Sequence, residues 1–260
     1  MSVILEVKNI SKNFGGLKAV SELSFNVNKG DILSIIGPNG AGKTTVFNLI
    51  TGYYNADSGK IFFKNMDITQ LPTHSIAKLG IGRTFQNLRL FKNLTVYDNV
   101  VTAAYSKNYY GLFSAIFSTP KKKKVSSQVD KKTFEILDFF NLSKKSSNLA
   151  GALPYGEQRR LELARAIATD PELVLIDEPA AGMNPSEVQE FVNLLKAAKE
   201  RYSLTFVLIE HQMELVMSLS ERIVVMDFGE KIMEGTPEEV KNDKRVIEAY
   251  LGADIKLEVS

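Results

Sequence analysis

Residues 37–44 read GPNGAGKT and fit the spacing Gly-x-x-x-x-Gly-Lys-Ser/Thr without a mismatch. Glycines at these positions let backbone N–H groups turn toward phosphate oxygens, and a helix that begins beside them adds the positive end of its dipole. Lys43 would then reach the outer phosphates of a nucleotide, and the Thr44 hydroxyl would bind Mg²⁺. The spacing therefore predicts a phosphate-binding loop. The alternative is a glycine-rich turn that holds no ligand.

Hydrolysis of the bound nucleotide needs a second group of residues, and the segment LVLIDEP (173–179) contains suitable ones. Asp177 ends an apolar run, so its carboxylate could face the Mg²⁺ held by Thr44. Glu178 follows and could accept a proton from the attacking water. Two solvated acids at the end of a strand are the alternative, but hydrolysis requires both a metal ligand and a group that orients water.

Three other side chains could take part, although the residues alone leave each role open. His211 follows the apolar run LTFVLIE (204–210), where it could contact a γ phosphate or simply pack. Gln86 could orient water or bind Mg²⁺, or be an ordinary loop residue. Phe14 could stack on a nucleotide base or belong to the core. His74 has no companion residues that suggest chemistry, and we expect it at the surface.

Strands and helices that alternate along the chain must position these residues. The phosphate loop follows the apolar run DILSIIG (31–37) and precedes TVFNLITG (45–52), which predicts a buried strand and then a helix that Gly52 closes. Later apolar runs have helical patterns between them, which predicts a parallel sheet covered by helices. These runs are ELVLID (172–177), LTFVLIE (204–210) and RIVVMD (222–227), and one intervening helix is SEVQEFVNLLKAAKE (186–200).

Two other regions have different patterns. Near the N-terminus, polar and apolar residues alternate in segments that predict antiparallel strands with one solvated face, namely ILEVKNI (4–10), LSFNVN (23–28) and KIFFKN (60–65). Residues 95–168 contain no convincing strand, and the segment DKKTFEILDFF (130–140) places Phe134, Leu137 and Phe140 on one helical face. We expect a single α/β domain, with a helical subdomain at about 95–168 inserted between about 1–94 and 169–260.

Composition limits the possible partners. Among 260 residues the formal net charge is only +2, which gives no support for a nucleic-acid partner. The absence of cysteine excludes disulfides and thiolate metal sites. No run approaches the ~20 apolar residues that span a bilayer, and the N-terminus lacks the apolar core of a secretion signal, so we expect a soluble chain. The run Lys121–Lys124 predicts a solvated loop, with contact to anionic lipid as the alternative.

Several segments together resemble the nucleotide-binding subunit of an ABC transporter, over nearly the whole chain. In order they are NFGG, GPNGAGKTT, TFQN, LPYGEQRRLELARA, LVLIDEPAAGMNP and IEH. Within that superfamily the chain is similar to the ATPase subunits that energise branched-chain amino acid uptake. That similarity rests on GIGRTFQNLRLFKNLTVYDNV, YGEQRRLELARA, DEPAAGMNP, FGEKIMEGTPEEV and the ending AYLGA.

The resemblance implies a P-loop NTPase fold, with ATP and Mg²⁺ as cofactors, and it assigns roles to individual residues. Glu178 is the implied base and His211 the γ-phosphate switch. Gln86 is implied to sense metal and water and to couple to the membrane subunit; the implied metal ligands are Thr44, Gln86 and Asp177. The implied nucleotide-binding residues are Phe14, Gly37, Pro38, Asn39, Gly40, Ala41, Gly42, Lys43, Thr44 and Thr45, with Tyr155, Gly156 and Glu157 acting in trans across a head-to-tail dimer.

Two segments depart from the general family pattern. The common signature Leu-Ser-Gly-Gly-Gln is here PYGEQ (154–158), which puts a phenol in place of a hydroxyl and an acid in place of a glycine. An anion beside the γ phosphate is unfavourable unless Glu157 points away or pairs with Arg159 or Arg160. The usual aspartate after the base is Asn184, which removes a charge from the expected dimer seam. Both variants resemble those of the amino-acid-uptake branch.

The function that this resemblance implies is the ATP-hydrolysing motor of an importer for branched-chain amino acids, with ATP hydrolysed at the head-to-tail dimer interface. It implies separate membrane permease subunits, a second ATPase subunit that is identical or paralogous, and an extracytoplasmic solute-binding protein. The expected location is the cytoplasmic face of the cell (inner) membrane. The alternatives are the ATPase of a lipid or glycolipid exporter, a soluble cassette that acts on ribosomes or chromosomes, and a small-molecule phosphotransferase, which would leave YGEQRRLELARA unused.

Overall fold

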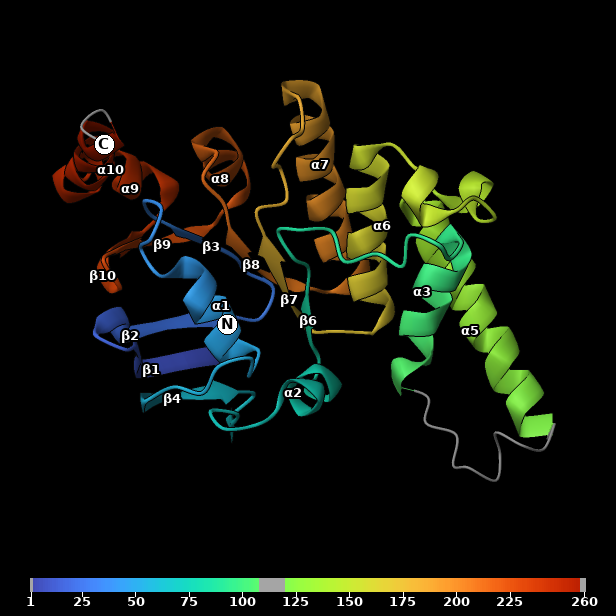
Figure 1. Ribbon diagram of the computed structural model, residues 1–260. Helices are drawn as coiled ribbons and strands as arrows, with labels where there is room; N and C mark the ends of the chain where they lie inside the picture. Colours follow the sequence, from blue (N-terminus) through green and yellow to red (C-terminus); the bar gives the residue numbers. More distant parts are fainter. Residues whose placement is uncertain (1, 108–119, 258–260) are drawn as a thin grey trace. The chain divides into compact units, whose positions relative to one another are not determined.

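The computed structural model describes residues 2–107 and 120–257 (Figure 1). The chain divides into two compact units, each of which is considered by itself. The first unit comprises Met1–Arg83 and Glu172–Ser260, and the second comprises Thr84–Pro171. The helical subdomain predicted at about 95–168 falls inside the second unit, and its exact bounds stay a prediction.

The first unit contains an antiparallel sheet with the strand order β2-β1-β4-β5. Its strands are β1 (Val3–Phe14), β2 (Leu17–Asn28), β4 (Ser58–Phe63) and β5 (Met66–Asp67). The alternating pattern that predicted these strands reflects one buried face, with Leu5, Val7 and Val27 in the core. Strands β1 and β2 are longer than predicted, because they continue to a tight turn in which Phe14 pairs with Leu17.

A second sheet in the same unit has the strand order β10-β9-β3-β8-β7-β6. It consists of β3 (Ile32–Ile36), β6 (Ile81–Arg83), β7 (Leu173–Asp177), β8 (Thr205–Ile209), β9 (Arg222–Asp227) and β10 (Glu230–Gly235). The central strands β3, β7 and β8 are buried at every position and pair in parallel, as the continuous apolar runs predicted. The sequence did not reveal the edge strands, since β6 is short and β10 has no buried residue.

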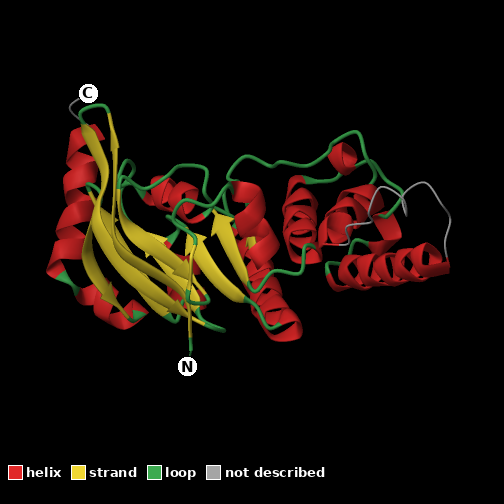
Figure 2. Cartoon of the chain, turned by 90° about the horizontal axis from the view of Figure 1, so that it is seen from below, coloured by secondary structure: helices red, strands yellow, loops and turns green. Residues whose placement is uncertain are grey.

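Helices of the first unit pack on these sheets. They are α1 (Lys43–Ile50), α2 (Thr73–Leu79), α7 (Pro185–Tyr202), α8 (Met213–Leu219), α9 (Pro237–Asn242) and α10 (Lys244–Leu257). The main apolar core joins both sheets to α1, whose Val46, Phe47 and Leu49 are buried in it. The helix that follows the phosphate loop is therefore fixed on several sides. Residues 169–260 and 1–94 supply every strand of the described chain, shown in yellow in Figure 2.

The described part of the second unit is helical. It contains α3 (Val96–Ala104), η1 (Tyr105–Lys107), α5 (Pro120–Phe139), η2 (Ser143–Lys145), η3 (Ala150–Ala152) and α6 (Tyr155–Ala168), plus one isolated bridge between Thr95 and Leu149. Leu137 and Phe140 are buried as the helical pattern predicted. Phe134 differs, because it is 47% exposed and its ring lies 5.3 Å from that of Tyr97.

The prediction of a loop at Lys121–Lys124 is wrong, because these residues lie in the first turns of α5. Proline suits the first position of a helix, since its fixed φ is already helical and its missing N–H has no acceptor there. Pro120 occupies that position, and lysine is a good helix former. The run is therefore the beginning of a helix rather than an extended segment.

Candidate functional site

The phosphate loop connects β3 to α1, and two of its glycines are required by close backbone packing. Gly37 and Gly42 have φ values of +150° and +95°. A Cβ atom on Gly37 would lie 2.0 Å from the Met226 carbonyl oxygen, and one on Gly42 would lie 2.2 Å from that of Ala19. Side chains are thus excluded at both positions, and neighbouring strands hold the loop in its shape.

Backbone hydrogen bonds fix the rest of this loop. The Ala41 N–H donates to the Pro38 carbonyl at 3.2 Å, and the Gly229 N–H donates to the Ala41 carbonyl at 3.1 Å. Helix α1 begins at Lys43, so the N–H groups of its first turn have no acceptor within the helix. Such a turn is a ready site for phosphate oxygens, which fits the predicted nucleotide. Thr44 is exposed at this helix end, and Thr45 is half-buried.

Lys43 is buried beside the two acids that the sequence singled out. Its Nζ donates to the carbonyl oxygens of Gly37 at 2.6 Å and Pro38 at 2.9 Å. Burial lowers the pKa of Lys43, and the charges of Glu178 and Asp177 oppose that effect. The lysine and the two carboxylates therefore act on one another within one site.

Asp177 is the last residue of β7 and is only 4% exposed. Its carboxylate lies 3.2 Å from the Arg83 guanidinium. Burial raises the pKa of Asp177, and the Arg83 cation opposes the rise. Arg83 also donates to Asn48 Oδ1 at 2.8 Å and to Thr51 Oγ1 at 3.1 Å, so it joins the Asp177 carboxylate to α1. Sequence reasoning missed Arg83, since only the pairing of β6 with β7 brings it to Asp177.

Glu178 and His211 lie at the neighbouring carboxyl ends of β7 and β8, whose parallel pairing brings them together. His211 Nδ1 is 4.0 Å from Glu178 Oε2. The Glu178 backbone has the left-handed φ of +45°, and its N–H donates to the Ile209 carbonyl at 2.9 Å. The implied base and the implied phosphate switch thus share one end of the sheet.

Glu210 is a further residue of this site that sequence reasoning missed, although it stands in the segment IEH. It is fully buried, with 0% exposure. Its carboxylate accepts hydrogen bonds from the N–H groups of Ala180 at 3.3 Å, His211 at 2.9 Å and Gln212 at 3.2 Å. Glu210 therefore ties the loop after Glu178 to the loop that carries His211. The sequence feature that could have identified Glu210 is its position as a glutamate at the end of an apolar run.

Phe14 is not part of the core, so the interpretation of Phe14 as a core residue is wrong. It is 41% exposed at the end of β1. Its ring meets that of Tyr54 edge to face, with centroids 5.0 Å apart, and the Lys12 ammonium lies 5.7 Å from its centroid. The hairpin that carries Phe14 also places the Ala19 carbonyl against Gly42. His74 is exposed, as predicted.

The second unit contains Gln86 and the signature residues Tyr155, Gly156 and Glu157, which form the first turn of α6. Glu157 pairs with Lys145, at 2.6 Å, a cation that the sequence did not single out. Arg159, which was one expected partner of Glu157, makes other hydrogen bonds. It is buried and donates to the Gln86 carbonyl at 2.6 Å and to the Tyr155 hydroxyl at 2.7 Å.

The residues of the first unit fit a nucleotide with its magnesium ion. Mg²⁺ prefers oxygen ligands and usually binds through one or two carboxylates together with substrate phosphates. The Asp177 carboxylate and the Thr44 hydroxyl supply that chemistry. Among the side chains that the structure describes, no group of three histidines, cysteines, aspartates or glutamates could hold a metal ion.

Comparisons with known proteins agree with this geometry. Residues 20–181 match the family model described as ABC transporter, and residues 230–256 match the one described as branched-chain amino acid ATP-binding cassette transporter. The high-affinity branched-chain amino acid transport ATP-binding protein LivG of Salmonella typhimurium is 42% identical over 249 residues, which are 96% of this chain and 98% of the relative. The protein BraF of Pseudomonas aeruginosa, which has the same description, matches with the same identity and coverage.

Solved structures lead to the same family. The ADP conformation of an ATP-binding cassette of an ABC transporter matches with a TM-score of 0.83 and 35% identity, over 97% of this chain and 100% of that one. A nucleotide-free ATP-binding cassette matches with a TM-score of 0.82 and 37% identity, over 95% and 98%. None of the described helices combines the length and apolarity that a bilayer-spanning segment needs. The chain therefore belongs to the ABC transporter family, as an ATP-binding cassette with a P-loop α/β fold.

Proposed function

We propose that this chain is the ATP-hydrolysing motor subunit of an importer for branched-chain amino acids. The observation that carries the ATPase assignment is the convergence of Lys43, Asp177 and Glu178 beside the phosphate loop. The substrate class rests on the relatives named for branched-chain amino acid transport and on the family match at residues 230–256. That match and those relatives favour uptake over the lipid-exporter alternative.

In the proposed reaction, Lys43 and the first N–H groups of α1 bind the phosphates. Thr44 and Asp177 would hold Mg²⁺, for which Gln86 is a proposed further ligand. When bound, the metal would supply positive charge that offsets the charge developing on the transferred phosphoryl group. Glu178 accepts a proton from the attacking water, while His211 donates a hydrogen bond to the γ phosphate. Glu210 keeps the loops that carry these two residues in register.

Two cassettes are proposed to act together, with each ATP held between the phosphate loop of one and the signature of the other. Related cassettes with 26% identity form a dimer bound to ADP and phosphate, according to the description of one solved structure. Residues Tyr155–Glu157 begin α6, so its dipole favours an anion at that end. The partner cassette is a second copy or a paralogue. Membrane permease subunits then place the chain at the cytoplasmic face of the inner membrane.

The test of hydrolysis is the variant Glu178→Gln, which keeps the size of the side chain and removes the proton acceptor. We expect ATP to bind with little change and turnover to fall by about 100-fold or more, since general-base catalysis typically contributes that much. Lys43→Ala is the contrasting variant, because it should weaken ATP binding itself. Steady-state ATPase rates and titration calorimetry separate these effects. Normal turnover in Glu178→Gln would refute the base assignment.

The transport assignment needs a separate experiment. The Glu178→Gln protein is purified with ATP and Mg²⁺ from its native membranes, and the chains that accompany it are identified by mass spectrometry. We expect two hydrophobic permease subunits and a second cassette ATPase among these chains. When the wild-type complex is reconstituted into lipid vesicles, we expect it to transport leucine, isoleucine or valine. Ribosomal proteins, or vesicles that transport only lipid, would leave the ATPase assignment intact and overturn the importer.

A further inference from the structure

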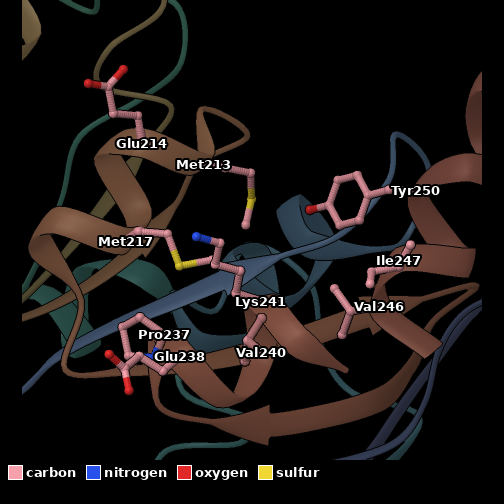
Figure 3. Close-up of a pocket in the computed structure, with 10 residues that line it drawn as sticks. All are labelled: Met213, Glu214, Met217, Pro237, Glu238, Val240, Lys241, Val246, Ile247 and Tyr250. Carbon is pink, nitrogen blue, oxygen red and sulfur yellow. The ribbon is translucent and has the colours of Figure 1, made fainter. Parts of the chain in front are cut away.

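The second unit buries two charged side chains that the proposed reaction does not use. They are Arg159 and Glu162 of α6, which are 3% and 5% exposed. The first unit offers an apolar groove instead, between α8, α9 and α10, with Met213, Met217 and Ile247 in its lining (Figure 3). The described part of the chain does not show what covers that groove, whereas the hydrogen-bond partners of Arg159 and Glu162 lie in the second unit itself.

The Arg159 guanidinium bridges the Gln86 backbone and the signature. Its Nη2 donates to the Gln86 carbonyl oxygen at 2.6 Å and to the Tyr155 hydroxyl at 2.7 Å. Nε donates to the same hydroxyl at 3.0 Å, and Nη1 donates to the Phe85 carbonyl at 2.9 Å. Because the guanidinium is planar and rigid, it fixes the Tyr155 hydroxyl and the Gln86 carbonyl relative to one another.

Glu162 holds the same segment from one turn further along α6. Its carboxylate lies 3.3 Å from Arg159 Nη1 and accepts from the N–H groups of Phe85 and Arg89, both at 3.3 Å. A buried ion pair is stable only when its remaining donors and acceptors are satisfied as well. Backbone groups of residues 85–89 satisfy several of them, so this segment is tied to the helix whose first turn is the signature.

We propose that Arg159 is a positioning residue that couples the two ATP sites of the cassette dimer. This coupling rests on the proposed function, in which Gln86 serves the ATP of its own cassette and Tyr155–Glu157 serve the ATP of the partner. A shift of the Gln86 backbone toward its own nucleotide stretches the hydrogen bonds of Arg159 unless Tyr155 follows. Occupation of one site therefore draws the signature of the same chain into the arrangement that the other site needs.

Coupling of this kind makes the two ATP sites cooperative. If ATP at one site favours the arrangement that the other site binds, thermodynamic linkage requires the reverse as well. Contiguous hydrogen-bonded groups carry such coupling when they move as a unit. The dependence of the hydrolysis rate on ATP concentration should therefore have a Hill coefficient above about 1, with a limit of about 2 for two sites.

The test is the variant Arg159→Lys in the full-length chain, in the assembly with which it purifies. Lysine keeps the charge beside Glu162, but its single ammonium cannot reproduce the planar fork that joins Gln86 to Tyr155. We expect the Hill coefficient of ATP hydrolysis to fall to about 1. Tyr155→Phe removes the signature end of the bridge and keeps the ring, so it should lower the coefficient in the same way. Hydrolysis rates over a range of ATP concentrations, at saturating Mg²⁺, give the coefficient for each protein.

Arg165→Lys is the matched control. Arg165, in the last turn of α6, donates to the Arg89 carbonyl and so holds the same segment without bridging it to the signature. This variant should therefore lower the free energy of unfolding without reducing the Hill coefficient. Urea-induced unfolding of all the variants shows which of them are destabilised.

The possible outcomes separate the coupling from the proposed function. A wild-type coefficient of about 1 would overturn the coupling and leave the ATPase assignment intact. Unchanged cooperativity in Arg159→Lys or in Tyr155→Phe would do the same, as would an equal loss of cooperativity in Arg165→Lys. Absence of hydrolysis in the wild-type assembly would instead overturn the proposed function, and the coupling with it.

Discussion

At the scale of single residues, the site depends on charges that are buried together. Asp177 has little exposure and depends on Arg83 for compensation, while Lys43 depends on the two acids. Taking a charge out of water is costly unless a partner of opposite sign is held nearby. The nucleotide site is therefore a network in which removal of one member affects the others.

Removal of the Arg83 cation tests this network. We expect Arg83→Met to lower the free energy of unfolding by about 3 kcal/mol, because Asp177 stays buried without its compensating partner. The measurement is urea-induced unfolding of the full chain. Arg245→Met is the control, since Arg245 pairs with Asp243 at the surface and its loss should have little effect. Equal effects of the two variants would contradict the role given to Arg83.

Glu162 makes the stability of the protein dependent on pH. It is buried and accepts from the N–H groups of Phe85 and Arg89, both at 3.3 Å, and from Arg159. Burial nevertheless raises its pKa above the ordinary value of 4.5. The folded state then binds this proton more tightly than the unfolded state. The resulting stabilisation is complete below the ordinary pKa and is lost as pH rises through the raised pKa.

Glu162→Gln removes that titration. The stability of the wild type relative to this variant should therefore fall as pH rises from about 4.5 toward neutrality. Urea unfolding of both proteins at several pH values gives the difference directly. Glu135→Gln, at an exposed position of α5, is the control variant. A difference that grows in favour of the wild type with rising pH would show that the sign is wrong.

At the scale of elements, helix ends position the residues that follow β7. Helix α7 begins with a capping box, in which the Asn184 side chain accepts from the Glu187 N–H at 3.0 Å and Glu187 accepts from the Asn184 N–H at 2.9 Å. From the sequence alone, Asn184 was interpreted only as a replacement for the usual aspartate, which removes a negative charge from the expected dimer seam. In the structure the same residue holds the start of a helix.

Substitution at this cap separates the two roles of Asn184. We expect Asn184→Ala to lower the free energy of unfolding by about 1 kcal/mol, whereas Asn184→Asp should nearly keep it, because aspartate caps equally well. Thermal and urea unfolding provide the measurement. Ser186→Ala in the first turn of α7 is the matched control. If Asn184→Asp destabilised as much as Asn184→Ala, the cap would not explain the residue.

At the scale of the whole molecule, the assembly proposed above depends on the charge of the signature. Glu157 stands in the first turn of α6, and Lys145 compensates its charge. An uncompensated anion here would repel the phosphates that the partner cassette is proposed to present. The pair is partly exposed, so its effect should be modest.

Lys145→Ala in the Glu178→Gln background tests this effect. We expect the ATP-dependent dimer to dissociate about twofold to fivefold more readily, which corresponds to the range measured for partly exposed ion pairs. Analytical ultracentrifugation with ATP and Mg²⁺ gives the dissociation constant. Lys144→Ala is the control, since the neighbouring lysine is exposed. A tighter dimer in Lys145→Ala would exclude repulsion by Glu157.

Much of the fold could be predicted from local patterns. The central strands, α1 and the phosphate loop were predicted, because buried parallel strands are continuous apolar runs and the loop spacing is specific. Strands β6 and β10 were missed, since short or half-exposed edge strands carry little pattern. The helix at Lys121–Lys124 was missed because a charge run has no apolar period.

The sequence by itself determined the chemistry of this protein: a lysine, a hydroxyl and two acids at spacings that suit ATP hydrolysis. Only the tertiary structure decided which residues support them. Arg83 and Asp177 are 94 positions apart, and Glu210 reaches Ala180 across 30 positions. Such contacts leave no mark at local spacing, because they arise when parallel strands distant in sequence are paired. Local spacing in the sequence therefore identifies each motif residue by itself. The charged residues that compensate and position the motif residues are identified only by the order in which the strands pair.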